Sequence, residues 1–153
     1  MTRKLKEFVN HRAPNEGALL PNDYAHDHIT ILMALYNGAV TLDDQLESIA
    51  NQTHENWSLI VSDDGSVDDW RRSIDRFATK YKAQMRLVTG PQKGSTQNFL
   101  KLIEQAGPLA PFAALCDQDD VWLPPKLARA VHILKEIPPA IPALYVTPTF
   151  ICD

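Results

Sequence analysis

Ile29-Thr30-Ile31-Leu32-Met33-Ala34-Leu35 is an almost continuously apolar stretch that stops at Tyr36-Asn37-Gly38. A short apolar run bounded by turn-forming residues is typical of a strand buried on both faces of a parallel sheet. The spacing of the apolar residues that follow predicts a helix beginning at Thr41-Leu42-Asp43-Asp44. A buried strand followed by a helix is the first unit of an α/β fold.

The same unit repeats along the chain. Further strands are predicted over residues 59–61, 85–88, 111–116 and, after a Pro-rich break at 138–142, over 143–151; helices are predicted near 70–81, 95–106 and 126–136. Two of these helices have one apolar face each, formed by Trp70, Ile74, Phe77 and Tyr81 and by Phe99, Leu102, Ile103 and Ala106. Alternating strands and helices predict an α/β fold with a mostly parallel sheet and helices on both faces.

One acidic turn follows the apolar run 111–116. Asp117-Gln118-Asp119-Asp120 places three carboxylates in four positions, and their mutual repulsion must be offset by a cation or by hydrogen-bond donors. Oxygen ligands suit Mg²⁺ or Mn²⁺, which complete their shell with phosphate oxygens and water, so a nucleoside diphosphate compound is a natural ligand. The alternative is a solvated turn that caps the helix starting near Pro124.

A second acidic turn, Ser62-Asp63-Asp64-Gly65-Ser66, follows the predicted strand 59–61. In an open α/β sheet, ligands bind at the carboxyl ends of the strands, so both acidic turns are expected at one crevice. The pattern Ser66-Val67-Asp68-Asp69 also fits a helix start, and we assign Ser66, Asp68 and Asp69 to helix capping.

Together, four motifs resemble the family 2 glycosyltransferases, an inverting group with a Rossmann-like GT-A nucleotide-diphospho-sugar transferase fold. They occupy residues 31–38, 45–53, 62–66 and 117–122, the last being similar to the family's DxD motif followed by an aromatic residue. The resemblance covers residues 29–153, which we expect to form the nucleotide-sugar-binding domain. We expect residues 1–28 to be a partly disordered N-terminal extension.

The resemblance implies a donor site for a UDP- or dTDP-sugar. Asp63 is expected to contact the base, and Leu35 and Tyr36 to line the base pocket. Asp117 corresponds to the acid on the ribose or metal side of the DxD motif, and Asp119 to the ligand of Mn²⁺ or Mg²⁺. Metal ligation is thus assigned to Asp117 and Asp119.

Other residues near these motifs receive supporting roles. Asp120 either orients Asp119 or caps the next helix. Asn98 and Lys93 lie at a helix start that could approach phosphate or nucleoside, although Lys93 is equally compatible with an exposed loop charge. Gln118 is placed in the nucleotide-sugar site, and its pairing with Trp122 is similar to members that transfer rhamnose or related sugars to bacterial surface glycans.

The half that supplies the acceptor site and general base in the family has no match here, so the fold is expected to be incomplete at the C-terminus. Catalytic residues are therefore left unassigned. A truncated product, a split protein and a dissected fragment all fit this pattern. The leading hypothesis is an inverting glycosyltransferase that acts on a glycan or lipid-linked acceptor in bacterial surface polysaccharide synthesis. Its rivals are a non-catalytic nucleotide-sugar-binding module and an inactive remnant that self-associates through the uncovered surface.

Composition limits the other classes of function. The 153 residues, 44% of them hydrophobic, suffice for one domain, and a net charge of −4 argues against nucleic-acid binding. Cys116 and Cys152 have no zinc-type spacing and suggest reduced thiols, and no apolar run approaches the length of a membrane span. We expect a cytoplasmic protein, with peripheral membrane association allowed by a lipid-linked acceptor. His26-Asp27-His28 is expected to face solvent rather than bind metal.

Overall fold

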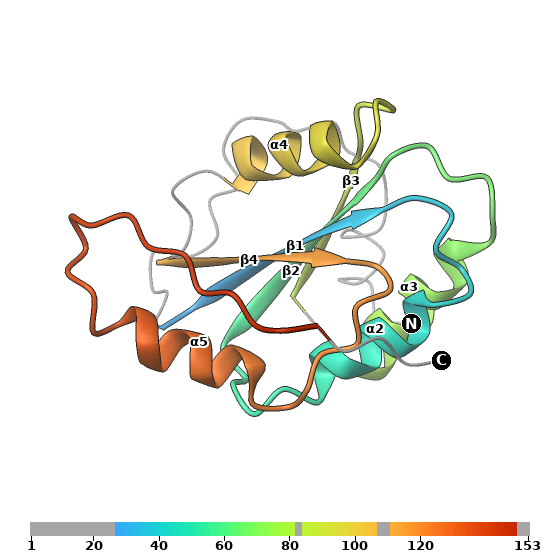
Figure 1. Cartoon of the computed structure of the whole chain (residues 1–153). Coiled ribbons are helices and arrows are strands. Elements are labelled where there is room, and N and C mark those ends of the chain that lie inside the picture. Colours follow the sequence, from blue (N-terminus) through green and yellow to red (C-terminus); the bar gives the residue numbers. More distant parts are fainter. Residues whose placement is uncertain (1–26, 82–83, 107–110, 150–153) are drawn as a thin grey trace.

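The computed structural model describes residues 27–81, 84–106 and 111–149, which form a parallel sheet with helices on both faces (Figure 1). The elements in chain order are β1 (Ile29–Leu35), α2 (Leu42–Ala50), β2 (Trp57–Asp63), α3 (Trp70–Tyr81), β3 (Met85–Thr89), α4 (Ser95–Ala106), β4 (Phe112–Asp117) and α5 (Lys126–Leu134). The predicted α/β class and the alternation of strands and helices up to α5 are confirmed.

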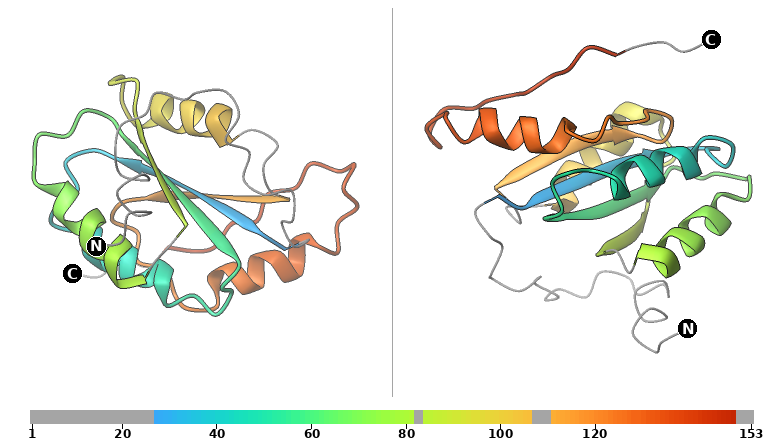
Figure 2. Two further views of the ribbon diagram at one scale, coloured as in Figure 1. Left: turned by 180° about the vertical axis from the view of Figure 1, so that it is seen from behind. Right: turned by 90° about the horizontal axis from the view of Figure 1, so that it is seen from below.

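The strand order in the sheet is β3-β2-β1-β4, and all neighbours are parallel. The chain therefore starts in the middle of the sheet, runs outward to β3 and returns to the other side of β1 for β4. Because strand crossovers are right-handed, this reversal of direction puts α4 on the face opposite α2 and α3 (Figures 1 and 2). The carboxyl ends of the neighbouring strands β1 and β4 thus form a topological switch point, where open α/β sheets bind ligands.

Every residue of β1 is buried, and alternate side chains enter two separate cores. Ile31, Met33 and Leu35 lie in the larger core, which α2, α3 and α5 cover. Leu32 and Ala34 point the other way, into a smaller core with Ile60 of β2 and Leu102 and Ala106 of α4. A near-continuous apolar strand is therefore required at the centre of the sheet.

Helix α4 packs against β1 and β2 and leaves part of its predicted apolar face open. Ile103, which belongs to this face, is 50% exposed. On the same face, Leu115 of β4 lies in register with Leu32 of β1 and is 53% exposed. The reason is that α4 lies over the centre of the sheet, so its outer flank and the face of β4 are not covered within the described residues.

The predicted strand over 143–151 is wrong for its described part. Residues 143–149 are not in a strand, and Leu144 and Val146 are largely exposed. The segment is held to the domain by a side-chain contact instead, in which Lys126 Nζ donates to Thr147 Oγ1 at 2.9 Å. The expected N-terminal extension up to residue 26, together with Cys152, lies outside the described residues.

Two polar predictions near the helix starts are also wrong. Ser66 and Asp68 do not cap α3, which begins at Trp70; their side chains accept hydrogen bonds from Asn37 N and Ala39 N. The side chains of Ser66 and Asp68 thus satisfy backbone donors in the loop after β1 rather than backbone donors at the start of α3. This arrangement joins the loops after β1 and β2.

His28, expected to face solvent, is buried at the start of β1. Its Nδ1 lies 2.8 Å from Asn56 Oδ1 and its Nε2 lies 3.0 Å from Ser58 Oγ. These two polar partners explain why an imidazole is tolerated there. Among the helices in the described ranges, none has the length and apolarity to cross a membrane.

The packing of the core predicts that two Leu→Ala substitutions differ in their effect on the free energy of unfolding. Leu59 in β2 is fully buried, so Leu59→Ala is expected to lower the free energy of unfolding by about 2–5 kcal/mol through lost burial and a residual cavity. Leu144→Ala removes the same atoms from a side chain that is 84% exposed and is expected to cost less than about 0.5 kcal/mol. Urea denaturation measures both, and equal effects would contradict this account of the core.

Candidate functional site

The carboxyl ends of the four strands meet at one edge of the sheet. Leu35 of β1 pairs with Asp63 of β2, and Asp63 pairs with Thr89 of β3. On the other side of β1, Ala34 pairs with Asp117 of β4. The parallel register therefore brings the two acidic turns to the same level, as the sequence predicts.

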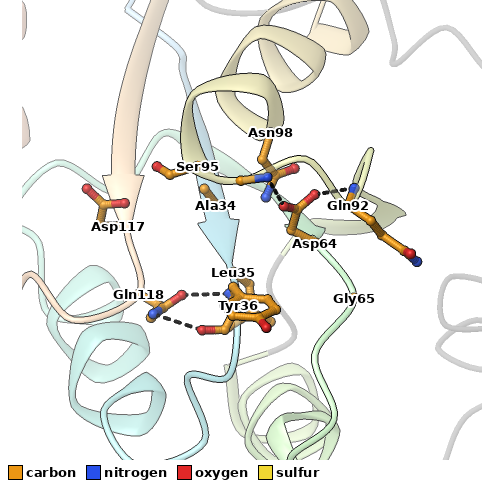
Figure 3. Close-up of a pocket in the computed structure, with 11 residues that line it drawn as sticks. Ala34, Leu35, Tyr36, Asp64, Gly65, Gln92, Ser95, Asn98, Asp117 and Gln118 are labelled. Atoms are coloured by element: carbon orange, nitrogen blue, oxygen red, sulfur yellow. Dashed lines mark hydrogen bonds between the residues drawn. The ribbon is translucent and has the colours of Figure 1, made fainter.

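A pocket of about 610 Å³ lies at this edge (Figure 3). Its walls come from the ends of β1, β2 and β4 and from the start of α4. The lining residues are Ala34, Leu35, Tyr36, Asp64, Gly65, Gln92, Gly94, Ser95, Asn98, Asp117 and Gln118. The pocket thus occupies the switch point of the sheet, and its size is in the usual range for small-ligand sites.

Asp64 fixes the loop between β3 and α4, which forms one wall of the pocket. It is almost fully buried, and its carboxylate accepts hydrogen bonds from Gln92 N at 2.6 Å and Gly94 N at 2.8 Å. Gln92 and Gly94 both have positive φ, which turns the backbone so that their N–H groups face one carboxylate. A buried acid satisfied by two backbone donors fixes the path of this loop.

Asp63, one residue earlier, has a different environment. Its Oδ1 accepts a hydrogen bond from Ser66 N at 2.9 Å, closing the turn after β2, and it is not among the lining residues. The base contact assigned to Asp63 therefore stays a prediction, while its neighbour Asp64 lines the pocket. Strand alternation cannot decide between the two acids, because both lie where β2 gives way to the turn.

Asn98 and Ser62 form a buried pair behind the pocket. Asn98 Nδ2 donates to Ser62 O at 2.9 Å, and Ser62 Oγ donates to Asn98 Oδ1 at 2.5 Å. The pair ties the first turn of α4 to the end of β2 across the smaller core. Asn98 thereby lines the pocket from a fixed position, and its role in nucleotide binding stays a prediction.

Asp117 lies at the end of β4 and lines the pocket. Partial burial, and then the negative charges of Asp120 and Asp119, raise the pKa of its carboxyl. Asp119 and Asp120 themselves lie exposed in the turn that follows. The repulsion among these carboxylates is of the kind that a bound cation would relieve.

The donor set fits a cation of a particular kind. Among the described residues, no three His, Cys, Asp or Glu side chains converge so that they could hold a metal ion. Mg²⁺ and Mn²⁺ commonly take only one or two protein carboxylates and complete their coordination with phosphate oxygens and water. A cation that arrives with a diphosphate needs no more protein ligands than the two predicted, Asp117 and Asp119, and their metal ligation stays a prediction.

The predicted site residues are distributed as follows. Leu35, Tyr36, Asn98, Asp117 and Gln118 line the pocket, whereas Asp63, Lys93 and Asp119 do not. Sequence reasoning missed the placement of Asp64, Gln92 and Ser95. Asp64 carried a signal, since it stands in the acidic turn, but Gln92 reaches the pocket only through the loop that Asp64 holds.

Known proteins with similar sequences include glycosyltransferases. The chain is 32% identical over 106 residues to the dTDP-rhamnosyl transferase RfbG of Shigella flexneri, an alignment that covers 67% of this chain and 36% of that protein. It is 29% identical over 107 residues to the Escherichia coli enzyme WfgD, named as a UDP-Glc:α-D-GlcNAc-diphosphoundecaprenol β-1,3-glucosyltransferase, with 69% and 40% covered. The chain thus spans well under half the length of these relatives.

Solved structures with a similar fold include two glycosyltransferases. TarS of Staphylococcus aureus superposes with a TM-score of 0.62 at 20% identity, covering 71% of this chain and 32% of that one. The mannosyltransferase PcManGT of Pyrobaculum calidifontis, in complex with GDP-Man and Mn²⁺, superposes with a TM-score of 0.61 at 22% identity, covering 84% and 37%. Both likenesses show the fold, which confirms the predicted GT-A architecture.

The family model described as "Glycosyl transferase family 2" matches residues 30–149, which include the pocket, both acidic turns and the four strands except Ile29, the first residue of β1. This match confirms the resemblance carried by the four sequence motifs. The chain belongs to glycosyl transferase family 2.

Proposed function

We propose that this chain forms the nucleotide-sugar donor site of an inverting glycosyltransferase that uses a UDP- or dTDP-sugar. The observation that carries the proposal is the crowded acidic end of β4, where Asp117 has a raised pKa and lines a pocket at the switch point. A divalent cation that arrives with the donor's diphosphate would offset the negative charge of these carboxylates. The names of the relatives RfbG and WfgD support dTDP- and UDP-linked donors.

Each wall of the pocket has a role in the proposed binding mode. Leu35 and Tyr36 form an apolar and aromatic wall suited to a base, and Asp63 or Asp64 supplies an acceptor for a base N–H. Asp117 is placed at the ribose or the cation, and Asp119 at the cation. Asn98 and the start of α4 close the opposite side.

In the proposed transfer, the acceptor hydroxyl oxygen bonds to the anomeric carbon as the bond from that carbon to the diphosphate oxygen breaks. The diphosphate leaves with the bonding electron pair, and the hydroxyl proton passes to a general base. A bound Mn²⁺ or Mg²⁺ supplies Lewis-acid stabilisation of the leaving group. Asp117 and Asp119 would hold this cation and, through it, the donor's diphosphate end, and no described residue is assigned as the base.

The acceptor we propose is a glycan or a lipid-linked sugar of a bacterial surface polysaccharide. The diphosphoundecaprenol in the name of WfgD supports a lipid-linked acceptor. Acceptor binding and transfer belong to a protein of the relatives' length, since this chain spans only 36% of RfbG and 40% of WfgD.

Calorimetric titration of UDP and dTDP, with and without Mn²⁺, tests the donor site. We expect nucleotide binding that strengthens with Mn²⁺, and little binding of Mn²⁺ alone, because phosphate oxygens must complete its coordination. Asp119→Asn is expected to weaken Mn²⁺-dependent binding by about tenfold or more, which is about 1.4 kcal/mol. Asp75→Asn, on the exposed face of α3, is the matched control and should bind as the wild type does. A folded wild-type protein that binds neither nucleotide would overturn the proposal.

The hydrogen bonds of Asp64 to the loop after β3 predict that its substitution lowers the stability of the protein even without ligand. Asp64→Asn replaces one acceptor oxygen by an NH₂ group, so either Gln92 N or Gly94 N loses its partner. We expect the free energy of unfolding to fall by about 1.5–3 kcal/mol in urea denaturation, as is typical of a lost hydrogen bond to a charged group. Asp75→Asn should change it by less than about 0.5 kcal/mol. Equal stability of the two variants would contradict the role given to Asp64.

A further inference from the structure

Gln118 uses both ends of its side-chain amide on one residue. Tyr36 N donates to Gln118 Oε1 at 2.8 Å, and Gln118 Nε2 donates to Tyr36 O at 3.2 Å (Figure 3). The two bonds join the residue just after β1 to the residue just after β4. Such a paired contact defines the position of a backbone far better than a single bond does.

These bonds continue the sheet beyond its last backbone pair. Strand β1 pairs with β4 as far as Ala34 and Asp117, where the ladder ends. The amide of Gln118 then presents one donor and one acceptor to Tyr36, as a neighbouring strand would. The side chain thereby restrains the backbone of Tyr36 although no strand lies beside it at that level.

Close packing against Gly38 keeps the Gln118 side chain in this position. A Cβ atom at Gly38 would lie 2.8 Å from Gln118 Cγ, so only glycine lets the side chain pass. That Cβ atom would also lie 2.8 Å from Leu35 Cδ1, so the side chains of Gln118 and Leu35 together explain the glycine in the turn after β1. The contact leaves Gln118 little freedom to swing into the pocket.

The other flank of the same turn is anchored to the loop after β2. Asn37, with φ +49°, donates from its backbone N to Ser66 Oγ at 2.8 Å, and its Oδ1 accepts from Val67 N at 2.9 Å. Tyr36 therefore lies between two anchored points, although its own side chain is 57% exposed and lines the pocket.

We propose that Gln118 is a positioning residue, which holds the backbone of Tyr36 so that the tyrosine ring forms a fixed wall of the donor pocket. This differs from the direct donor contact expected from the sequence, because the amide is already bonded through its oxygen and its nitrogen to Tyr36. The inference rests on the proposed donor site. An aromatic wall that is ordered before binding lowers the entropic cost of binding the nucleotide.

The experiment compares Gln118→Met, which keeps the length of the side chain and loses both hydrogen bonds, with Gln84→Met. Gln84 is exposed just before β3, at the amino end of the parallel sheet and therefore away from the pocket. UDP and dTDP are titrated with Mn²⁺ into the wild type, both variants, Tyr36→Ala and the double variant Gln118→Met/Tyr36→Ala. Amide hydrogen exchange at Tyr36 is followed in parallel, and urea denaturation checks that each variant is folded.

We expect Gln118→Met to weaken nucleotide binding by roughly three- to tenfold, the effect of releasing one ordered side chain. Exchange of the Tyr36 amide should become faster in Gln118→Met and stay unchanged in Gln84→Met. In the Tyr36→Ala background, Gln118→Met should have little further effect, because the two residues act through one contact. This non-additivity separates positioning from a general loss of stability.

Three results would overturn the inference. In the first, Gln118→Met binds nucleotide as well as the wild type does, although its Tyr36 amide exchanges freely. That result would contradict the positioning role of Gln118 but would not contradict the proposed donor site. In the second, the effects of the two substitutions on affinity add, which means that Gln118 contacts the donor itself. In the third, the folded wild type binds no nucleotide, and the proposed function falls together with the inference. Should Gln118→Met fail to fold, Gln118→Asn, one methylene too short to form both bonds, takes its place.

Discussion

The parallel hydrogen-bonded register of β1 with both of its neighbours is the constraint on which the rest of the structure depends. It fixes Leu35 beside Asp63 and Ala34 beside Asp117, so the acidic turns after β2 and β4 lie on the two sides of one strand end. Burial of every β1 side chain makes this register costly to change, because a slip by one residue would exchange the two cores. The packing of the sheet thus determines the position of the site.

Side chains, rather than backbone ladders, hold the loops at this end of the sheet. Asp64 bonds the loop after β3, Ser66 and Asp68 bond the loop after β1, and Gln118 bonds Tyr36. Each contact satisfies a backbone donor that has no partner in the sheet, which is the general requirement at strand ends. The polar residues that sequence patterns associate with nucleotide and metal therefore divide into those that shape the loops and those left free to bind. Asp117 and Asp119 are assigned to the second group, since neither side chain makes a hydrogen bond with another residue in the described part of the chain.

Much of this could be predicted from the sequence, and the failures have identifiable causes. The apolar run 29–35 predicted a parallel sheet, and the acidic residues after strands predicted a site at the carboxyl ends of those strands. Both predictions were possible because buried strands and strand-end turns have local signatures. Ser66 and Asp68 were misassigned because a capping pattern and a loop-bridging pattern use the same residue types. The placement of Asp64 in the pocket wall was missed because its carboxylate meets the N–H groups of Gln92 and Gly94, some 30 residues later in the chain. A contact across that separation is set by tertiary packing and has no local signal.

The pocket is assembled from a continuous part of the chain. All of its lining residues lie between Ala34 and Gln118, and the side-chain bonds that shape its loops connect residues within the same interval. Helix α5 supports the larger core beneath the sheet but contributes no lining residue. The geometry of the proposed donor site therefore depends on the first four strands and the loops between them.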